Sequence, residues 1–159
     1  MKKVSLLFVV LAFLAFEMTA QVKTPSASPS SKVSQTIGLT EFAVEYSRPS
    51  MKGREIFGEG DEFLVQYGKT WRTGANRATK LSFDSNVTIN GVEMKKGTYA
   101  ILTVPQKGAW EVQFHSYESG SWSSYLEKEP AAVVKGKAMQ TKHKVETYTM
   151  SFQGLEKAG

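Results

Sequence analysis

The sequence has 159 residues, of which 41% are hydrophobic and 11% aromatic, enough for one domain with its own core. It contains no cysteine, which excludes disulfide bonds, thiol nucleophiles and cysteine-ligated metals. The formal net charge is +5, but the basic residues are spread along the chain and alternate with acidic ones, so nucleic-acid binding is not expected.

Residues 1–20 have the organisation of a cleavable secretory signal peptide. Two lysines follow the initiator methionine, residues 4–16 form an uncharged apolar run, and the small Ala20 ends the segment. The apolar run is shorter than the roughly 20 residues of a membrane-spanning helix, and a bacterial lipid anchor would need a cysteine. We therefore expect a periplasmic or extracellular protein with no stable membrane span after cleavage.

Residues 21–31 are rich in serine and proline and are expected to form an extended, mobile leader. Residues 32–159 are expected to form a single β domain, because apolar and polar residues alternate along several short segments. The predicted strands are residues 33–37, 42–46, 78–83, 87–89, 92–94, 98–104, 110–114, 131–138 and 147–152.

The clearest local signal is the pair Asn90-Gly91, which is preferred in two-residue type I′ hairpin turns because both positions need a positive φ. No segment has a sustained helical period, although residues 51–57 and 121–125 could each hold one helical turn. Short strands at this spacing predict an all-β fold, either an antiparallel β-sandwich or a jelly-roll-like domain of about eight or nine short strands.

Several segments of this domain carry motifs of a known family. They are residues 34–38, 44–50, 52–58 and 97–99, and residues 67–76 with the string Trp71-Arg72-Thr73-Gly74-Ala75-Asn76. These segments resemble the DUF2911 family, secreted bacterial proteins of unknown function that are common in Bacteroidetes-type bacteria. The resemblance covers about residues 29–152. It implies a periplasmic or secreted β domain without an established activity, and it supplies no catalytic residues.

Proteins of that family continue past the position of Phe152 with a further β-hairpin. The resemblance therefore implies that this sequence is either a natural short variant or is truncated at its C-terminus. A truncation would leave the last predicted strand without a neighbour.

Metal chemistry has little support in the sequence. The two histidines, His115 and His143, are far apart, and no carboxylates cluster near them at ligand spacing. His115 alternates outward from an apolar strand face and is expected to be solvated. We expect no metal site and no cofactor.

Catalytic motifs have equally little support: no serine nucleophile lies in a supporting context, and there is no phosphate-binding loop. A carboxylate pair for glycoside hydrolysis could in principle come from Glu59, Asp61, Glu62 or Glu111. The first three lie in a glycine-containing turn that is more simply a solvated loop. No catalytic residues are assigned.

The remaining candidate site is a cluster of basic, aromatic and polar residues in two loops that lack matching acids. We predict a rim that binds an anionic or carbohydrate ligand, because arginine recognises carboxylates with two parallel hydrogen bonds and aromatic faces stack on sugars. The candidate ligand-binding residues are Tyr46, Arg48, Arg54, Trp71, Arg72, Asn76 and Thr79.

A structural role for the same residues is the alternative. Trp71 would then fill one end of the core, and its polar neighbours would satisfy loop carbonyls. We expect Trp71 to be structural, so the binding hypothesis depends more on Arg48 and Arg54. A stacking surface at Trp110 or Trp122 is the next candidate.

These features together predict a non-catalytic binding or interaction module for a glycan or a small anionic ligand. Two alternatives remain open, a hydrolase acting on a glycan or ester and a structural envelope protein without a ligand. A hydrolase of glycans would need two carboxylates about 5–10 Å apart in one cleft. The sequence assigns no oligomeric state.

Overall fold

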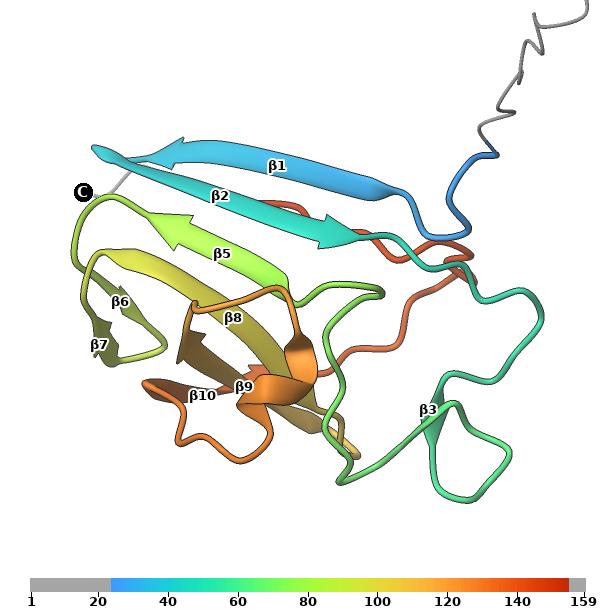
Figure 1. Ribbon diagram of the computed structural model, residues 1–159. Coiled ribbons are helices and arrows are strands. Elements are labelled where there is room, and N and C mark those ends of the chain that lie inside the picture. Colours follow the sequence, from blue (N-terminus) through green and yellow to red (C-terminus); the bar gives the residue numbers. More distant parts are fainter. Residues whose placement is uncertain (1–23, 155–159) are drawn as a thin grey trace, which may run out of the picture.

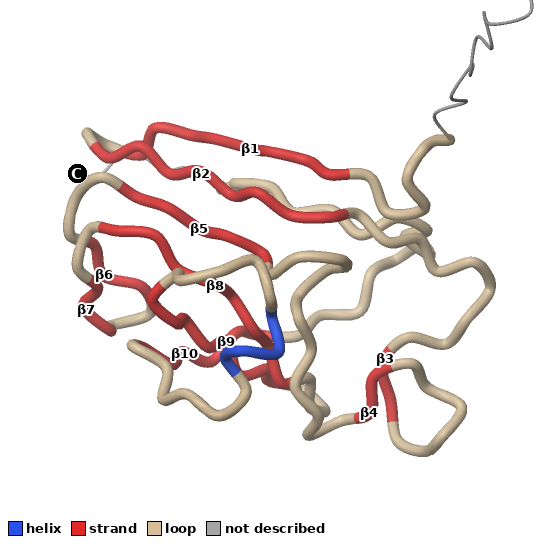
Figure 2. Tube along the Cα trace, in the orientation of Figure 1, coloured by secondary structure: helices blue, strands red, loops and turns tan. Residues whose placement is uncertain are grey.

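Six antiparallel strands form the main sheet of the computed structural model, which describes residues 24–154 (Figure 1). In sheet order they are β1 (Ser30–Ile37), β2 (Thr40–Ser47), β5 (Thr79–Phe83), β8 (Gly97–Val104), β9 (Ala109–Ser116) and β10 (Ala132–Lys137). Two small pairs stand beside this sheet: parallel β3 (Phe57–Gly58) and β4 (Val65–Gln66), and antiparallel β6 (Val87–Ile89) and β7 (Val92–Met94). The predicted all-β, antiparallel class is confirmed, and Figure 2 shows how much of the rest is loop.

The first two strands follow the predicted alternation and form a hairpin. Ile37 lies opposite Thr40, so Gly38 and Leu39 make the turn, with Gly38 at a φ of 63°. Strand β1 begins at Ser30, so the last two residues assigned to the leader belong to the sheet. The predicted signal peptide lies outside the described residues.

One face of the sheet carries the main core, which includes Phe83, Ile101 and Phe114. This face is covered by the β6–β7 hairpin and by the C-terminal segment, which runs behind the sheet in red in Figure 1. Met150 and Phe152 pack against the core from that segment, as the alternation predicts.

The strand predicted over residues 147–152 does not form, apart from one bridge between Thr147 and Ser50. The reason is that side chains bind its backbone. The Met150 N–H donates to the Tyr46 hydroxyl (3.0 Å), and the Tyr148 carbonyl accepts from Arg48 (3.1 Å). Backbone pairing is limited to the start of the segment, where the Tyr148 N–H donates to the Pro49 carbonyl (2.9 Å) beside the bridge, and the rest is extended without a strand partner.

The Asn90–Gly91 turn is confirmed, with φ angles of 46° and 82°. The Asn90 side-chain amide also donates to the carbonyl of Lys135 (3.0 Å). This bond attaches the small hairpin to edge strand β10.

The opposite face of the sheet is covered at one end by a flap, which we define as residues 117–128. It contains the one predicted helical turn that forms, the 3-10 helix η1 (Trp122–Tyr125), whereas residues 51–57 contain a turn but no helix. Tyr125 is 1% exposed and packs with Ala100 and Leu102. No helix in the described part of the chain is long and apolar enough to cross a membrane.

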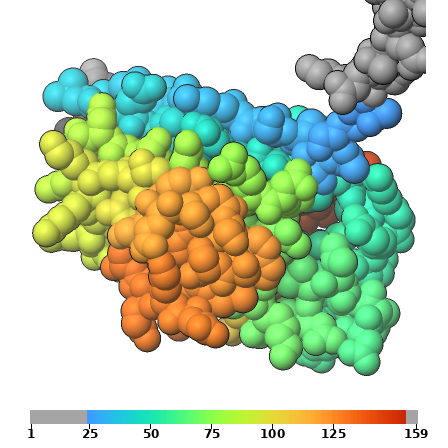
Figure 3. All heavy atoms as spheres, in the orientation of Figure 1, coloured from blue at the N-terminus to red at the C-terminus, as the bar shows by residue number. Residues whose placement is uncertain are grey.

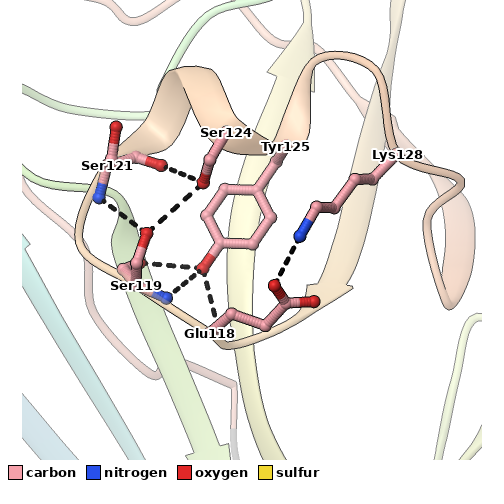
Figure 4. A network of polar contacts seen from close by, with 6 residues as sticks. All are labelled: Glu118, Ser119, Ser121, Ser124, Tyr125 and Lys128. Carbon is pink, nitrogen blue, oxygen red and sulfur yellow. Dashed lines mark hydrogen bonds and ion pairs between the residues drawn. The ribbon is translucent and has the colours of Figure 1, made fainter.

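The Tyr125 hydroxyl is the centre of the polar network within the flap (Figure 4). It accepts from the backbone N–H groups of Glu118 and Ser119 (2.9 Å each) and donates to the Ser119 carbonyl (2.8 Å). Lys128 forms an ion pair with Glu118 in the same view. The buried ring thus satisfies the backbone of the loop that covers it.

The flap overturns the expectation that His115 is solvated. His115 does point away from the main core, as the alternation predicts, but it is only 3% exposed. Its ring lies 5.5 Å from that of Tyr125, and neither ring nitrogen has a hydrogen-bond partner among the described residues. Alternation gives the side of the sheet, but not whether a distant segment covers that side.

Replacing Tyr125 with phenylalanine is expected to lower the free energy of unfolding by about 1–3 kcal/mol, because two partly buried N–H groups lose their acceptor. Tyr117→Phe is a matched control, since the hydroxyl of Tyr117 has no hydrogen-bond partner in residues 24–154. We expect that control to stay within about 0.5 kcal/mol of the wild type. Urea unfolding measures both, and equal losses would contradict the role given to the hydroxyl.

Candidate ligand-binding cleft

The larger of the two hollows described here is a cleft of about 870 Å³ at one end of the sheet. Its lining comes from five parts of the chain: Ser28, residues 49–57 after β2, residues 63–76 ahead of β5, Trp122, and residues 141–148. Figure 3 shows the loops around residues 50–75, in teal and green, with a hollowed surface between them and the blue N-terminal strand. Four of the seven predicted site residues line this cleft: Arg54, Trp71, Arg72 and Asn76.

Aromatic side chains make one wall of the cleft. The Trp71 ring lies 5.0 Å from Phe57 and 5.2 Å from Tyr148, both at steep angles. The Trp71 backbone is paired with Thr103 through two hydrogen bonds of 2.7 and 2.9 Å, so the ring is anchored to the end of β8. Trp110 packs behind Phe57 (4.6 Å) rather than lining the cleft.

The loop that follows Trp71 has an unusual backbone. Thr73 is buried with a φ of 55° and Asn76 has a φ of 59°, in the left-handed region that costs a non-glycine residue about 1–2 kcal/mol. Hydrogen bonds hold this shape: Thr73 donates to the Thr103 hydroxyl (3.2 Å), and its carbonyl accepts from Thr79 (2.7 Å). The loop therefore holds the backbone of Arg72 in a fixed position.

Gly74 follows in the same loop, at a φ of 149°. A Cβ added there would lie 3.1 Å from the Ser47 carbonyl oxygen. The Asn76 side-chain amide donates to the Ser28 carbonyl (3.1 Å), which attaches the segment before β1 to the loop.

Arg72 is the side chain that this loop presents. It is half-buried, and its guanidinium lies 4.9 Å from the centre of the Trp122 ring. Among residues 24–154 it has neither a hydrogen-bond acceptor nor a carboxylate within ion-pair distance. A guanidinium that lies over an aromatic ring and has no protein acceptor keeps its N–H donors for a ligand. Trp122, a separate candidate in the sequence, thus belongs to this site.

The other two arginines are engaged by the protein to different degrees. Arg54 donates from Nε to the Met51 carbonyl (2.9 Å) and from Nη2 to the Ser50 carbonyl (2.8 Å). Its second Nη group has no partner among the described residues, and it lines the cleft. Arg48 donates to the Thr149 hydroxyl (2.9 Å) and to the Tyr148 carbonyl (3.1 Å), and it does not line the cleft.

Two further predicted residues lie away from the cleft. Tyr46 is buried in the main core, with its hydroxyl bonded to Met150, and Thr79 is fully buried beneath the Thr73 carbonyl. Both help to hold the segments that form the cleft. Of the three residues predicted around the first loop, Tyr46, Arg48 and Arg54, only Arg54 therefore lines the cleft.

The cleft carries an excess of positive charge. Lys69 and Lys144 line it together with the two arginines, whereas the acidic lining residue within the described chain is Glu146. One Glu146 carboxylate oxygen already accepts from the backbone N–H of Lys52 (2.9 Å). Burial raises the pKa of Tyr148 above its usual range, so this wall residue stays a neutral phenol.

The lining residues that sequence reasoning did not assign to the site include Phe57, Lys69, Lys144 and Tyr148. The alternation around Tyr148 had marked it as a core residue, and no local pattern joins the two lysines to the Trp71 loop. Within the described residues, no group of three or more histidine, aspartate or glutamate side chains is arranged to hold a metal ion.

Comparison with known proteins gives one match. A family model described as "Protein of unknown function (DUF2911)" matches residues 28–159, which include every part of the chain that forms the cleft. No curated protein matches the chain, and no solved structure does.

Proposed function

Since the chain belongs to the DUF2911 family of proteins of unknown function, its activity has to be inferred from the cleft, and we propose a non-catalytic binding module for a small acidic ligand, specifically an acidic sugar. The observation that carries this proposal is Arg72, a half-buried arginine stacked on Trp122 with no acceptor in residues 24–154. Arginine donors fit a carboxylate, and the aromatic wall offers an apolar surface for a sugar ring.

The charge and the backbone of the cleft support the same proposal. Four cationic side chains and one carboxylate line the cleft. This excess of positive charge attracts an anionic ligand. The strained Thr73 backbone is a cost that ordinary packing does not require, and strain of this kind is typical of functional sites.

The number of acidic residues in the cleft favours a binding function over a hydrolase. Glycoside hydrolysis uses two carboxyl groups in one site, and Glu146 is the single carboxylate among the described lining residues. The glycine-containing turn at residues 59–62 does not line the cleft.

Equilibrium binding of galacturonic acid tests the proposal, with galactose as the uncharged reference. We expect the acid to bind and the neutral sugar to bind far more weakly, and the affinity for the acid to fall as salt is added. Tryptophan fluorescence or calorimetry measures both. Equal binding of the two sugars, or binding of neither, would overturn the proposal.

Replacing Arg72 with alanine is expected to weaken binding of the acid by roughly ten- to a hundredfold, because a hydrogen-bonded charge pair contributes about 1.5–3 kcal/mol. Its free energy of unfolding should change by no more than about 0.5 kcal/mol. Lys107→Ala is the control, since Lys107 is exposed in the β8–β9 turn outside the cleft and its loss changes the net charge equally. Loss of binding in both variants would mean that only the net charge matters.

A further inference from the structure

We propose that the natural ligand is an acidic oligosaccharide that extends from the cleft into a second hollow on the flap side of the sheet. This inference rests on the proposed function and adds the size of the ligand. The second hollow has a volume of about 490 Å³, and its lining includes Lys32, Glu45, Arg77, Lys80 and Tyr117.

The two hollows repeat one arrangement, a cation over an aromatic ring. In the cleft, Arg72 lies 4.9 Å from the Trp122 ring centre, and in the second hollow the Lys80 ammonium lies 5.7 Å from that of Tyr117. Both rings come from the flap, and the two cations come from neighbouring parts of the chain: Arg72 lies in the loop before β5, and Lys80 lies in β5 itself.

These two segments run side by side in opposite directions. Between the two cation–aromatic pairs, the N–H of Ala78 donates to the carbonyl of Gly120 (2.9 Å). The Cα atoms of residues 117 and 122 are at most about 18 Å apart even when the chain is fully extended, at about 3.3–3.6 Å per residue. The pairs are therefore close enough for one chain molecule of several sugar units to contact both.

The second hollow also carries a cation with no protein partner. Glu45 accepts from Lys80 (2.9 Å) and lies 3.8 Å from Lys32. The hydrogen bond to Lys80 lowers the Glu45 pKa, so Glu45 is a carboxylate that offsets one of the two lysine charges. Arg77 has no acceptor or carboxylate partner among the described residues, as is the case for Arg72. Each hollow thus offers one unpaired guanidinium to an anion.

Gly120 sets the position of Arg77. A Cβ added at Gly120 would lie 2.4 Å from the Arg77 Nε, so the arginine can lie over this residue only because it lacks a side chain. The φ of Gly120 is outside the left-handed region, so alanine is compatible with the backbone. Gly120→Ala is therefore expected to displace the Arg77 side chain without changing any charge.

Calorimetric titration with galacturonic acid and its α-1,4-linked hexamer tests the inference, with the fully methyl-esterified hexamer as the uncharged control. We expect the acidic hexamer to bind about a hundredfold more tightly than the monomer, beyond the statistical gain from its repeated units. Arg77→Ala and Gly120→Ala should each weaken hexamer binding roughly tenfold and leave monomer binding unchanged. Lys107→Ala should affect neither ligand, and thermal melts report whether each variant is folded.

The outcomes separate the two proposals. If the monomer binds but the hexamer gains only its statistical factor, or if Arg77→Ala leaves hexamer binding unchanged, the extended ligand is wrong and the binding function stands. If neither acid binds, the proposed function fails and this inference fails with it. Equal binding of the esterified hexamer would also overturn the inference, because the guanidinium groups would then have no part in recognition.

Discussion

Replacing His115 with leucine is expected to raise the stability of the protein and to remove part of its sensitivity to mild acid. The ring is buried against Tyr125 and neither nitrogen has a partner in the described residues, so each polar atom is desolvated without compensation. An apolar side chain of similar size avoids that penalty, which is about 1–3 kcal/mol for a buried unsatisfied group. In a domain of this size the expected gain is several degrees in Tm.

The pH dependence follows from the direction of the shift in pKa. Burial, and secondarily the charge of Lys128, lowers the His115 pKa below its ordinary value of 6.5. As pH falls through this value, the unfolded chain takes up a proton that the folded protein does not, so the free energy of unfolding falls. Wild-type stability should therefore decrease between about pH 7.5 and pH 5.5, and the leucine variant should lose less.

Urea unfolding at the two pH values measures this effect, and His143 provides the control because it is exposed. His143→Gln should stay within about 0.5 kcal/mol of the wild type at neutral pH and keep the wild-type loss on acidification. A leucine variant at residue 115 that is less stable than the wild type at neutral pH would show that the imidazole nitrogens are satisfied, for instance by buried water.

Replacing Trp71 with alanine is expected to cause the largest loss of stability of the substitutions considered, about 3–5 kcal/mol. The ring contacts Phe57, Trp110 and Tyr148, which come from three distant parts of the chain. Its removal leaves a space at the point where these parts meet, and aromatic pairs add to the cost beyond the area buried. Guanidinium chloride unfolding measures the loss as a lower midpoint at an unchanged slope.

Trp122 is the matched comparison, since it is also a half-buried tryptophan that lines the cleft. Trp122→Ala should cost less stability, because the ring packs against the small cluster around Tyr125 and contacts Arg72 from one side. It should weaken binding of the acidic sugar more than its stability loss explains, because Arg72 loses the surface that orients it. If the two substitutions cost equal stability, Trp71 has no special structural role.

The elements that could be predicted from sequence are those whose pattern is local. The alternation around residue 44 predicts β2, and the Asn90-Gly91 pair predicts a hairpin turn whose observed φ angles are those that the pair favours. A side-chain period of two results from the strand backbone itself, so it survives in any tertiary context. The single helical turn was also predictable from local sequence, since η1 lies within the predicted residues 121–125.

The strand predicted at residues 147–152 failed for a tertiary reason. Its side chains alternate correctly, but strand formation needs a neighbouring backbone along the whole segment. Here the backbone around Ser50 pairs only with its start, and Tyr46 and Arg48 supply side-chain partners further on. Pattern alone does not distinguish an extended segment that is bound by side chains from one that is bound by a strand.

The candidate site divides in the same way. The sequence by itself determined which residues supply hydrogen-bond donors and aromatic surface, namely Arg54, Trp71, Arg72 and Asn76. These four side chains line one cleft. Only the tertiary structure decided which arginine is available. Arg48 is hydrogen-bonded to the C-terminal segment. Arg72 instead lies over the ring of Trp122, fifty residues further along the chain. Residue type determines what a guanidinium can bind, but its partners come from segments that only folding brings together, and those partners decide which arginine is left for a ligand.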